Sequence, residues 1–127
     1  MNEKREILLI DDDATSNLIN EVVIKKSNLF NSIKTVIAAE SGLNYLLSKP
    51  DNLPEVIFLD INMPEMDGWE FLDKFAELDT EIRDKIDIYM LSSSQNPDDI
   101  IRAVKNPFVK DFLSKPLKLE MIKRKFE

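Results

Sequence analysis

Cysteine and histidine are both absent from this sequence, and their absence excludes several classes of protein chemistry. A chain without cysteine has no disulfides and no thiol nucleophile. A chain without histidine has no imidazole base, so serine–histidine–aspartate triads and the usual structural zinc sites are excluded. Only two glycines are present, and no apolar run is longer than a few residues. Any chemistry must therefore use carboxylates, lysine, hydroxyl groups or a metal ion bound by oxygen atoms.

The balance of charge is acidic. Seventeen basic and 24 acidic side chains give a net charge of −7, which repels the phosphates of nucleic acids and of anionic lipids. Because the apolar runs are short, we expect neither a signal peptide nor a membrane span. Binding to nucleic acid or to a membrane is thus disfavoured, and a cytoplasmic location is the default expectation.

The length of 127 residues is typical of one domain. Short apolar runs alternate with amphipathic stretches, without a linker or a repeat, and this alternation is typical of βαβ units. We therefore predict a single α/β domain over residues 1–127. Strands are predicted at residues 7–10, 33–38, 56–59, 86–91 and 109–113.

Apolar residues at helical spacing follow each predicted strand. Ser41 is predicted to cap the second helix, and Asn96 followed by Pro97 is predicted to begin the fourth. The apolar positions that indicate the five helices are Leu18, Ile19, Val22 and Val23; Leu43, Leu46 and Leu47; Phe71, Leu72, Phe75 and Ala76; Ile100, Ile101 and Val104; and Leu119, Ile122 and Phe126.

Charged or hydroxyl side chains stand at the ends of four predicted strands. Because the carboxyl ends of parallel strands meet at one edge of a sheet, we expect these side chains to converge. Three of them are carboxylates, and two such charges about 4 Å apart repel by roughly 4 kcal/mol at an effective dielectric constant of 20. A bound cation or raised pKa values must compensate. The converging residues are Asp11, Asp12, Asp60, Ser92 and Lys115.

Oxygen ligands without sulfur or imidazole select Mg²⁺ or Mn²⁺. The charges of the three carboxylates, of Lys115 and of one Mg²⁺ are −3, +1 and +2, and they sum to zero. Such a site can admit a phosphoryl group, and Asp60 is the predicted nucleophile that forms an acyl phosphate. The added charge would attract the Ser92 hydroxyl and the Lys115 ammonium, which predicts a switch.

Four motifs give the chain a resemblance to bacterial response-regulator receiver domains of the stand-alone, chemotaxis-regulator-like kind. They are ILLIDD, FLDINMPEMDGWEF, YMLSSS and FLSKP, and together they extend the resemblance over essentially the whole chain. The resemblance implies a flavodoxin-like (βα)5 fold with a five-stranded parallel sheet in the order 2-1-3-4-5. It also implies a cis peptide bond before Pro116.

The same resemblance assigns the metal and phosphoryl sites. It implies that Asp60 is the phospho-acceptor and that Asp11, Asp12 and Asp60 bind the metal ion together with the backbone carbonyl of Asn62. Asp13 is expected to cap the following helix instead of binding metal.

Further residues match the switch of receiver domains. The resemblance implies that Ser92 is the switch hydroxyl and that Lys115 contacts the phosphoryl group. Phe112 matches the rotating aromatic residue but lacks the hydroxyl of tyrosine, so a hydrogen bond from that position is lost. Asn62 and Ser94 match the positions that influence how quickly the phosphoryl group is lost to water.

The function implied by the resemblance is signalling. The protein would take a phosphoryl group from a histidine kinase or a histidine phosphotransfer protein, and it would catalyse only its own phosphorylation and dephosphorylation. The fourth helix, fifth strand and fifth helix would form the surface that binds a downstream protein, with the chain a monomer or a phospho-induced dimer. No output domain follows in the sequence, so we expect a separate protein to carry the effect unless the chain is an excised fragment.

Two alternatives remain open. Asp11, Asp13 and Thr15 also fit the nucleophile pattern of haloacid-dehalogenase phosphatases. That family, however, expects glycine near this turn and further acidic ligands after its lysine, whereas only a short predicted helix follows Lys115. A phosphorylation-independent adaptor with a vestigial pocket is the other alternative, and the presence of every expected residue weighs against it.

Overall fold

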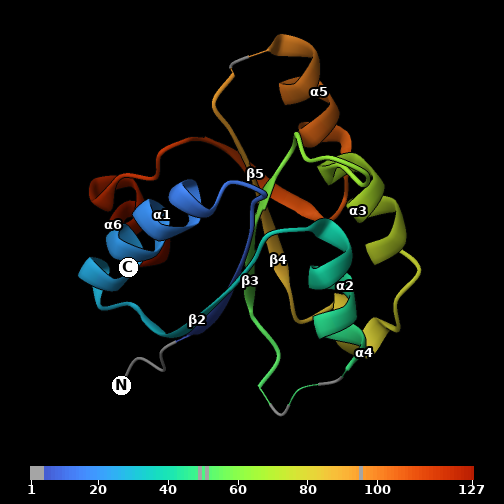
Figure 1. The fold of residues 1–127 in the computed structure, drawn as a ribbon, viewed down its shortest axis with the longest axis horizontal. Coiled ribbons are helices and arrows are strands. Elements are labelled where there is room, and N and C mark those ends of the chain that lie inside the picture. The colour runs from blue at the N-terminus through green and yellow to red at the C-terminus, as the bar shows by residue number, and fades with distance from the viewer. Residues whose placement is uncertain (1–4, 49, 51, 95) are drawn as a thin grey trace.

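The computed structural model describes residues 5–48, 50, 52–94 and 96–127. Within them, five parallel strands form one sheet in the order β2-β1-β3-β4-β5, which confirms the predicted α/β class and strand order. The strands are β1 (Arg5–Ile10), β2 (Phe30–Val36), β3 (Val56–Asp60), β4 (Asp87–Ser92) and β5 (Val109–Ser114) (Figure 1). The helices are α1 (Ala14–Ser27), α2 (Ala39–Leu47), α3 (Gly68–Phe75), α4 (Thr80–Arg83), α5 (Pro97–Lys105) and α6 (Leu119–Phe126).

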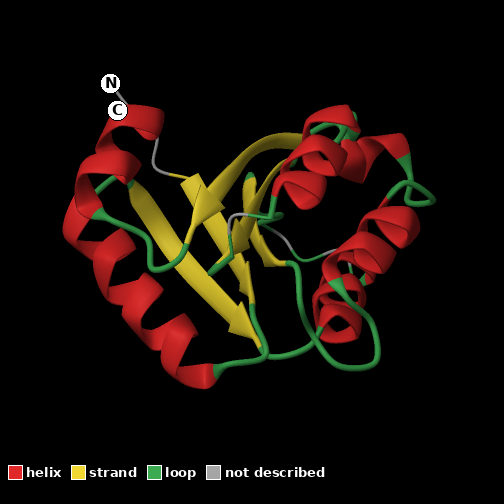
Figure 2. Ribbon diagram, turned by 90° about the horizontal axis from the view of Figure 1, so that it is seen from above, coloured by secondary structure: helices red, strands yellow, loops and turns green. Residues whose placement is uncertain are grey.

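Helices cover both faces of the sheet, with α1 and α6 on one side and the other helices on the opposite side (Figures 1 and 2). Side chains of successive strand residues point to opposite faces. In β1, Leu8 and Ile10 belong to the core cluster under α2 and α3, whereas Ile7 and Leu9 belong to the cluster under α1 and α6. This double coverage explains why the central strands are uninterrupted apolar runs. In the described part of the chain, no helix is long and apolar enough to cross a membrane.

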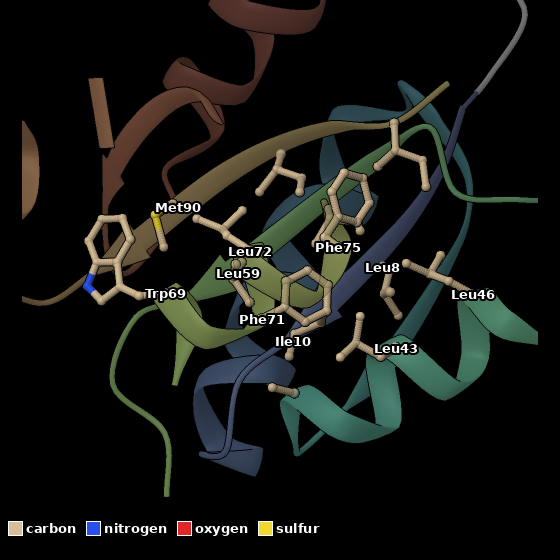
Figure 3. Packing of buried hydrophobic residues seen from close by; sticks show 14 of the residues in the cluster. Leu8, Ile10, Leu43, Leu46, Leu59, Trp69, Phe71, Leu72, Phe75 and Met90 are labelled. Atoms are coloured by element: carbon tan, nitrogen blue, oxygen red, sulfur yellow. The ribbon is translucent and has the colours of Figure 1, made fainter. Parts of the chain in front are cut away.

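The larger cluster lies between the sheet and helices α2, α3 and α5. Phe71 and Phe75 of α3 are fully buried, and their rings stack with centroids 6.1 Å apart. Figure 3 shows these rings among leucine and isoleucine side chains from the sheet and from α2. Trp69 packs at the margin of the cluster, where the guanidinium of Arg102 from α5 lies 4.4 Å from its ring centroid.

Three of the four apolar residues that predicted α1 do not lie on its inward face, and only Val23 packs against the core. Leu18, Ile19 and Val22 are 63%, 46% and 45% exposed. The buried residues of α1 are Asn17, Asn20, Ile24 and Ser27. Polar side chains can occupy a buried face where they bond to backbone groups, as both asparagines do here. Apolar spacing therefore predicted the helix correctly but most of its inward face incorrectly.

The structure can be compared with the sequence predictions for the other helices as well. Ser41 does not cap α2, because the helix begins at Ala39 with Ala38 as its N-cap. In α5, Ile101 and Val104 are 53% and 77% exposed, so the predicted apolar face points largely to solvent. The short helix α4 was not predicted from the sequence. The predicted start of α5 is confirmed, because the Asn96 side chain accepts a hydrogen bond from the amide of Asp98 at 3.0 Å.

A tight backbone approach places α3 beside the end of β3. The amide of Gly68 donates a hydrogen bond of 2.8 Å to the carbonyl of Ile61, and a Cβ atom on Gly68 would lie 2.8 Å from the carbonyl oxygen of Asp60. Because that neighbour is backbone, it cannot rotate away as the end of a side chain could. Gly68 thus lets the helix begin directly against the segment that carries Asp60.

We expect Gly68→Ala to lower the free energy of unfolding by about 1–3 kcal/mol, because the added methyl group overpacks against the β3 segment. Urea unfolding followed by circular dichroism measures the change. Asp73→Ala, at an exposed position in the same helix, is the control and should stay within about 0.5 kcal/mol of the wild type. Equal stability of the two variants would contradict the packing argument.

Candidate functional site

Three carboxylates meet where β1 and β3 end. Asp60 is the last residue of β3 and Asp11 directly follows β1, its neighbour in the sheet. One carboxylate oxygen from each of Asp11, Asp12 and Asp60 lies within 4.8 Å of the others. Asp11 and Asp60 are 2% and 5% exposed, so two of these charges are largely removed from water. The sequence prediction that these side chains converge is therefore met by the geometry.

Lys115, from the end of β5, completes the cluster. Its Nζ lies 2.9 Å from Oδ2 of Asp11 and 3.3 Å from Oδ1 of Asp60. The Lys115 side chain is 14% exposed, so water screens these ion pairs weakly. One ammonium thus bridges two buried carboxylates that would otherwise only repel each other.

The pKa values reflect both burial and the neighbouring charges. Burial raises the pKa of the Asp60 carboxyl from 3.8 to about 6, the negative charge of Asp11 adds to this increase, and Lys115 opposes it. Burial by itself would lower the pKa of Lys115, but the hydrogen bond to Asp11 and the charge of Asp60 outweigh burial. The pKa of this ammonium therefore lies above its ordinary value. The lysine stays charged, while the three carboxylates still carry more negative charge than it offsets.

The acidic run after β1 has divided roles. Oδ1 of Asp11 accepts a hydrogen bond from the amide of Asp13 at 2.9 Å. Oδ1 of Asp13 accepts hydrogen bonds from the amides of Thr15 at 2.9 Å and Ser16 at 3.3 Å. Asp13 thus caps α1, as predicted. The phosphatase pattern would need Asp13 as a reactive group, and its use as a cap counts against that alternative.

Ser92 ends β4 at the same edge of the sheet and is 2% exposed. Its Oγ accepts a hydrogen bond from the amide of Ser94 at 3.0 Å, and its carbonyl accepts one from the amide of Lys115 at 3.0 Å. Asn62 is exposed two residues beyond Asp60.

Two further predicted positions lie on β5 or directly after it. The half-buried Phe112 lines a groove of about 250 Å³ between α5 and β5 and does not belong to the carboxylate cluster. The peptide bond between Lys115 and Pro116 is cis.

Two functional candidates were missed in the sequence, and both are buried asparagines of α1. Nδ2 of Asn17 donates hydrogen bonds to the carbonyls of Asp11 at 3.0 Å and Val36 at 3.3 Å. Oδ1 of Asn20 accepts one from the amide of Leu117 at 3.0 Å. The sequence signal that could have revealed them is the spacing of Asn17, Asn20 and Ile24, which places two polar residues and one apolar residue on the same face of the helix.

The fold and site together define a flavodoxin-like α/β domain with an oxygen-only acidic cluster at the ends of its parallel strands. The family model described as "Response regulator receiver domain" matches residues 7–127, and the chain belongs to this family. It is a signalling module of two-component systems, as the sequence resemblance implied.

Individual relatives agree with this assignment. The chain is 29% identical over 117 residues to the chemotaxis protein CheY of Bacillus subtilis, which covers 91% of this chain and 89% of that protein. A two-component response regulator from Cytophaga hutchinsonii superposes with a TM-score of 0.88 at 32% identity, covering 96% of this chain and 94% of the other. For a response regulator receiver protein from Dyadobacter fermentans the TM-score is 0.85 at 29% identity, with 94% and 92% covered.

The raised pKa of Asp60 predicts that its charge destabilises the metal-free fold at neutral pH. Its bound proton stabilises the fold fully below pH 3.8, and this contribution is lost as the pH rises through about 6. The loss is up to about 3 kcal/mol, at about 1.4 kcal/mol for each pH unit between the two values. With EDTA present, Asp60→Asn should therefore become more stable relative to the wild type by that amount between about pH 4 and about pH 7.5.

Urea unfolding across this pH range measures the effect, and the lack of histidine leaves few other groups that titrate near pH 6. Asp98→Asn, at an exposed position of α5, is the control and should show no such trend. If the stability difference between Asp60→Asn and the wild type does not change with pH, the proposed burial of charge at Asp60 is wrong.

Proposed function

We propose that this protein accepts a phosphoryl group on Asp60 from a histidine kinase or a histidine phosphotransfer protein, in a reaction that requires a divalent metal ion. One observation supports this above the others. The Asp60 carboxylate lies beside two further carboxylates and within 3.3 Å of the Lys115 ammonium, at the carboxyl edge of a parallel sheet. A nucleophile flanked by a cation and by metal ligands suits phosphoryl transfer, in which negative charge must be offset.

Asp11, Asp12 and Asp60, with the backbone carbonyl of Asn62, would hold Mg²⁺ or Mn²⁺. The donor set fits, because all of its atoms are oxygen and three are carboxylate oxygens within 4.8 Å of one another. The raised pKa of Asp60 also fits, because burial and the negative charge of Asp11 disfavour its ionised form, and a bound cation would favour that form. When bound, the ion supplies positive charge beside the transferred phosphoryl oxygens.

The side chains of this protein perform the remaining steps. A carboxylate oxygen of Asp60 forms a bond to phosphorus, and the bond from phosphorus to the donor nitrogen breaks with its electron pair left on that nitrogen. Lys115 keeps Asp60 ionised by lowering its pKa and would contact the phosphoryl oxygens. The domain over residues 1–127 would thus catalyse its own phosphorylation and, with water, its dephosphorylation, at a rate that Asn62 and Ser94 influence.

Phosphorylation would then change a surface for partners. Ser92 and Lys115 would respond to the added charge, and Phe112 would change position at the groove between α5 and β5. The exposed Val104 of α5 lines this groove, and Ile101 is exposed on the same helix. The surface formed by α5, β5 and α6 would bind a downstream protein or a second phosphorylated copy.

A small-molecule phosphodonor with Mg²⁺ should add one phosphoryl group to the wild type and none to Asp60→Asn. Intact-mass spectrometry counts the groups, and EDTA should abolish the addition because the three carboxylates would remain uncompensated. Asp73→Asn, at an exposed position, should be labelled like the wild type. Labelling of Asp60→Asn would show that the acceptor is elsewhere, and an unlabelled wild type would favour the adaptor alternative.

Lys115→Ala should bind Mg²⁺ but take up the phosphoryl group about a hundredfold more slowly, because a charge beside the transferring group is lost. Phosphorylated Lys115→Ala should also show no change in amide hydrogen exchange near Phe112. Lys118→Ala, an exposed lysine three residues on, serves as the control for the loss of charge. A wild-type rate and a full exchange response in Lys115→Ala would contradict the role given to this lysine.

A further inference from the structure

Asn20 links α1 to the segment that carries Lys115. The residue is 1% exposed, and its Oδ1 accepts a hydrogen bond from the amide of Leu117 at 3.0 Å, across 97 residues of sequence. The side chain of Leu117 is itself buried, in the core cluster under α1 and α6. The bond therefore joins two buried groups, where a hydrogen bond is weakly exposed to competition from water.

Lys115 is held from both sides of its backbone. On one side, its own amide donates a hydrogen bond of 3.0 Å to the carbonyl of Ser92. Ser92 belongs to the last residue pair between β4 and β5. On the other side, beyond the end of β5, the amide of Leu117 donates to Asn20. These two contacts, from β4 and from α1, fix the backbone on either side of the side chain that reaches Asp11 and Asp60.

The position of the Lys115 ammonium depends on this fixed backbone. A lysine side chain has many rotamers and gains its direction from the position of its Cα atom. Asn20 and Lys115 line the same hollow of about 330 Å³, together with Ser93. A displacement of the segment by even 1 Å would move the ammonium relative to both carboxylates, and errors of this size can slow a reaction up to a hundredfold.

We propose that Asn20 is a positioning residue for phosphoryl transfer, which acts by holding the Lys115–Leu117 segment against α1. This proposal rests on the function proposed above. Asn20 acts through the lysine and does not itself touch the phosphoryl group. Its neighbour on the helix face, Asn17, bonds instead to the carbonyl of Asp11, so the two asparagines support different parts of the site.

A double-mutant cycle in the rate of labelling separates positioning from general destabilisation. The four proteins are the wild type, Asn20→Ala, Lys115→Ala and the double variant, labelled with a small phosphodonor and saturating Mg²⁺ and followed by intact mass. Asn20→Ala should be labelled about tenfold more slowly than the wild type. When Asn20→Ala is added to Lys115→Ala, the labelling rate should change less than about twofold, because the lysine that Asn20 positions is absent.

Equal slowing in both backgrounds, or no slowing in either, would overturn the proposal. Asn31→Ala, an exposed asparagine on β2, is the matched control and should be labelled like the wild type. Asn20→Asp keeps an acceptor oxygen for Leu117 and should be labelled faster than Asn20→Ala, so equal rates for these two variants would also count against the proposal.

Two measurements keep the test independent of whether the variants fold and of whether Asp60 is the phosphoryl acceptor. In the wild type, the amide of Leu117 should be among those protected against hydrogen exchange, and rapid exchange would refute the contact with Asn20. If the proposed phosphorylation of Asp60 is itself wrong, the result is different: the wild type stays unlabelled, or Asp60→Asn is labelled. A labelled wild type with an unaffected Asn20→Ala would refute only the role of Asn20.

Discussion

Mutual repulsion among three carboxylates is the constraint on which the site depends. Asp11 and Asp60 are buried, so their repulsion is weakly screened by water, and the protein offsets part of it with one ammonium at 2.9 Å and 3.3 Å. Burial and the negative charge of Asp11 raise the pKa of Asp60 despite the opposing effect of Lys115. The remaining negative charge is a cost to stability and also the property that makes the cluster suited to a divalent cation.

The sheet holds these like charges together. β1 and β3 are neighbours whose apolar residues are buried on both faces of the sheet, so their ends cannot separate without exposing apolar side chains from two core clusters. Close packing of α3 at Gly68 fixes the end of β3 in the same way. Hydrophobic burial thus stabilises an arrangement that electrostatics alone would disperse.

Buried asparagines extend this support to the loops, where the backbone ladders of the sheet end. Asn17 holds the segment after β1, and Asn20 holds the segment after β5. The same helix leaves Leu18, Ile19 and Val22 exposed. On α1, therefore, Asn17 and Asn20 share the inward face with Ile24 because they bond to backbone groups of other segments, whereas three of its apolar residues face solvent. A rule that assigns apolar residues to the interior holds for Ile24 but fails for Leu18, Ile19 and Val22.

The sequence by itself determined the alternation of the five strands with all the described helices except α4, the doubly covered central strands and the chemical types at the strand ends, because these follow from local periodicity and from runs such as residues 56–59. It also determined the caps at Asp13 and Asn96, which depend on neighbouring amides alone. Only the tertiary structure decided that Lys115 bridges Asp11 and Asp60 and that Asn20 meets Leu117, because residues far apart in the sequence must first be brought into contact. The inward face of α1 was likewise decided by the tertiary structure, because Asn17 and Asn20 bond to Val36 and Leu117, which are distant in the sequence.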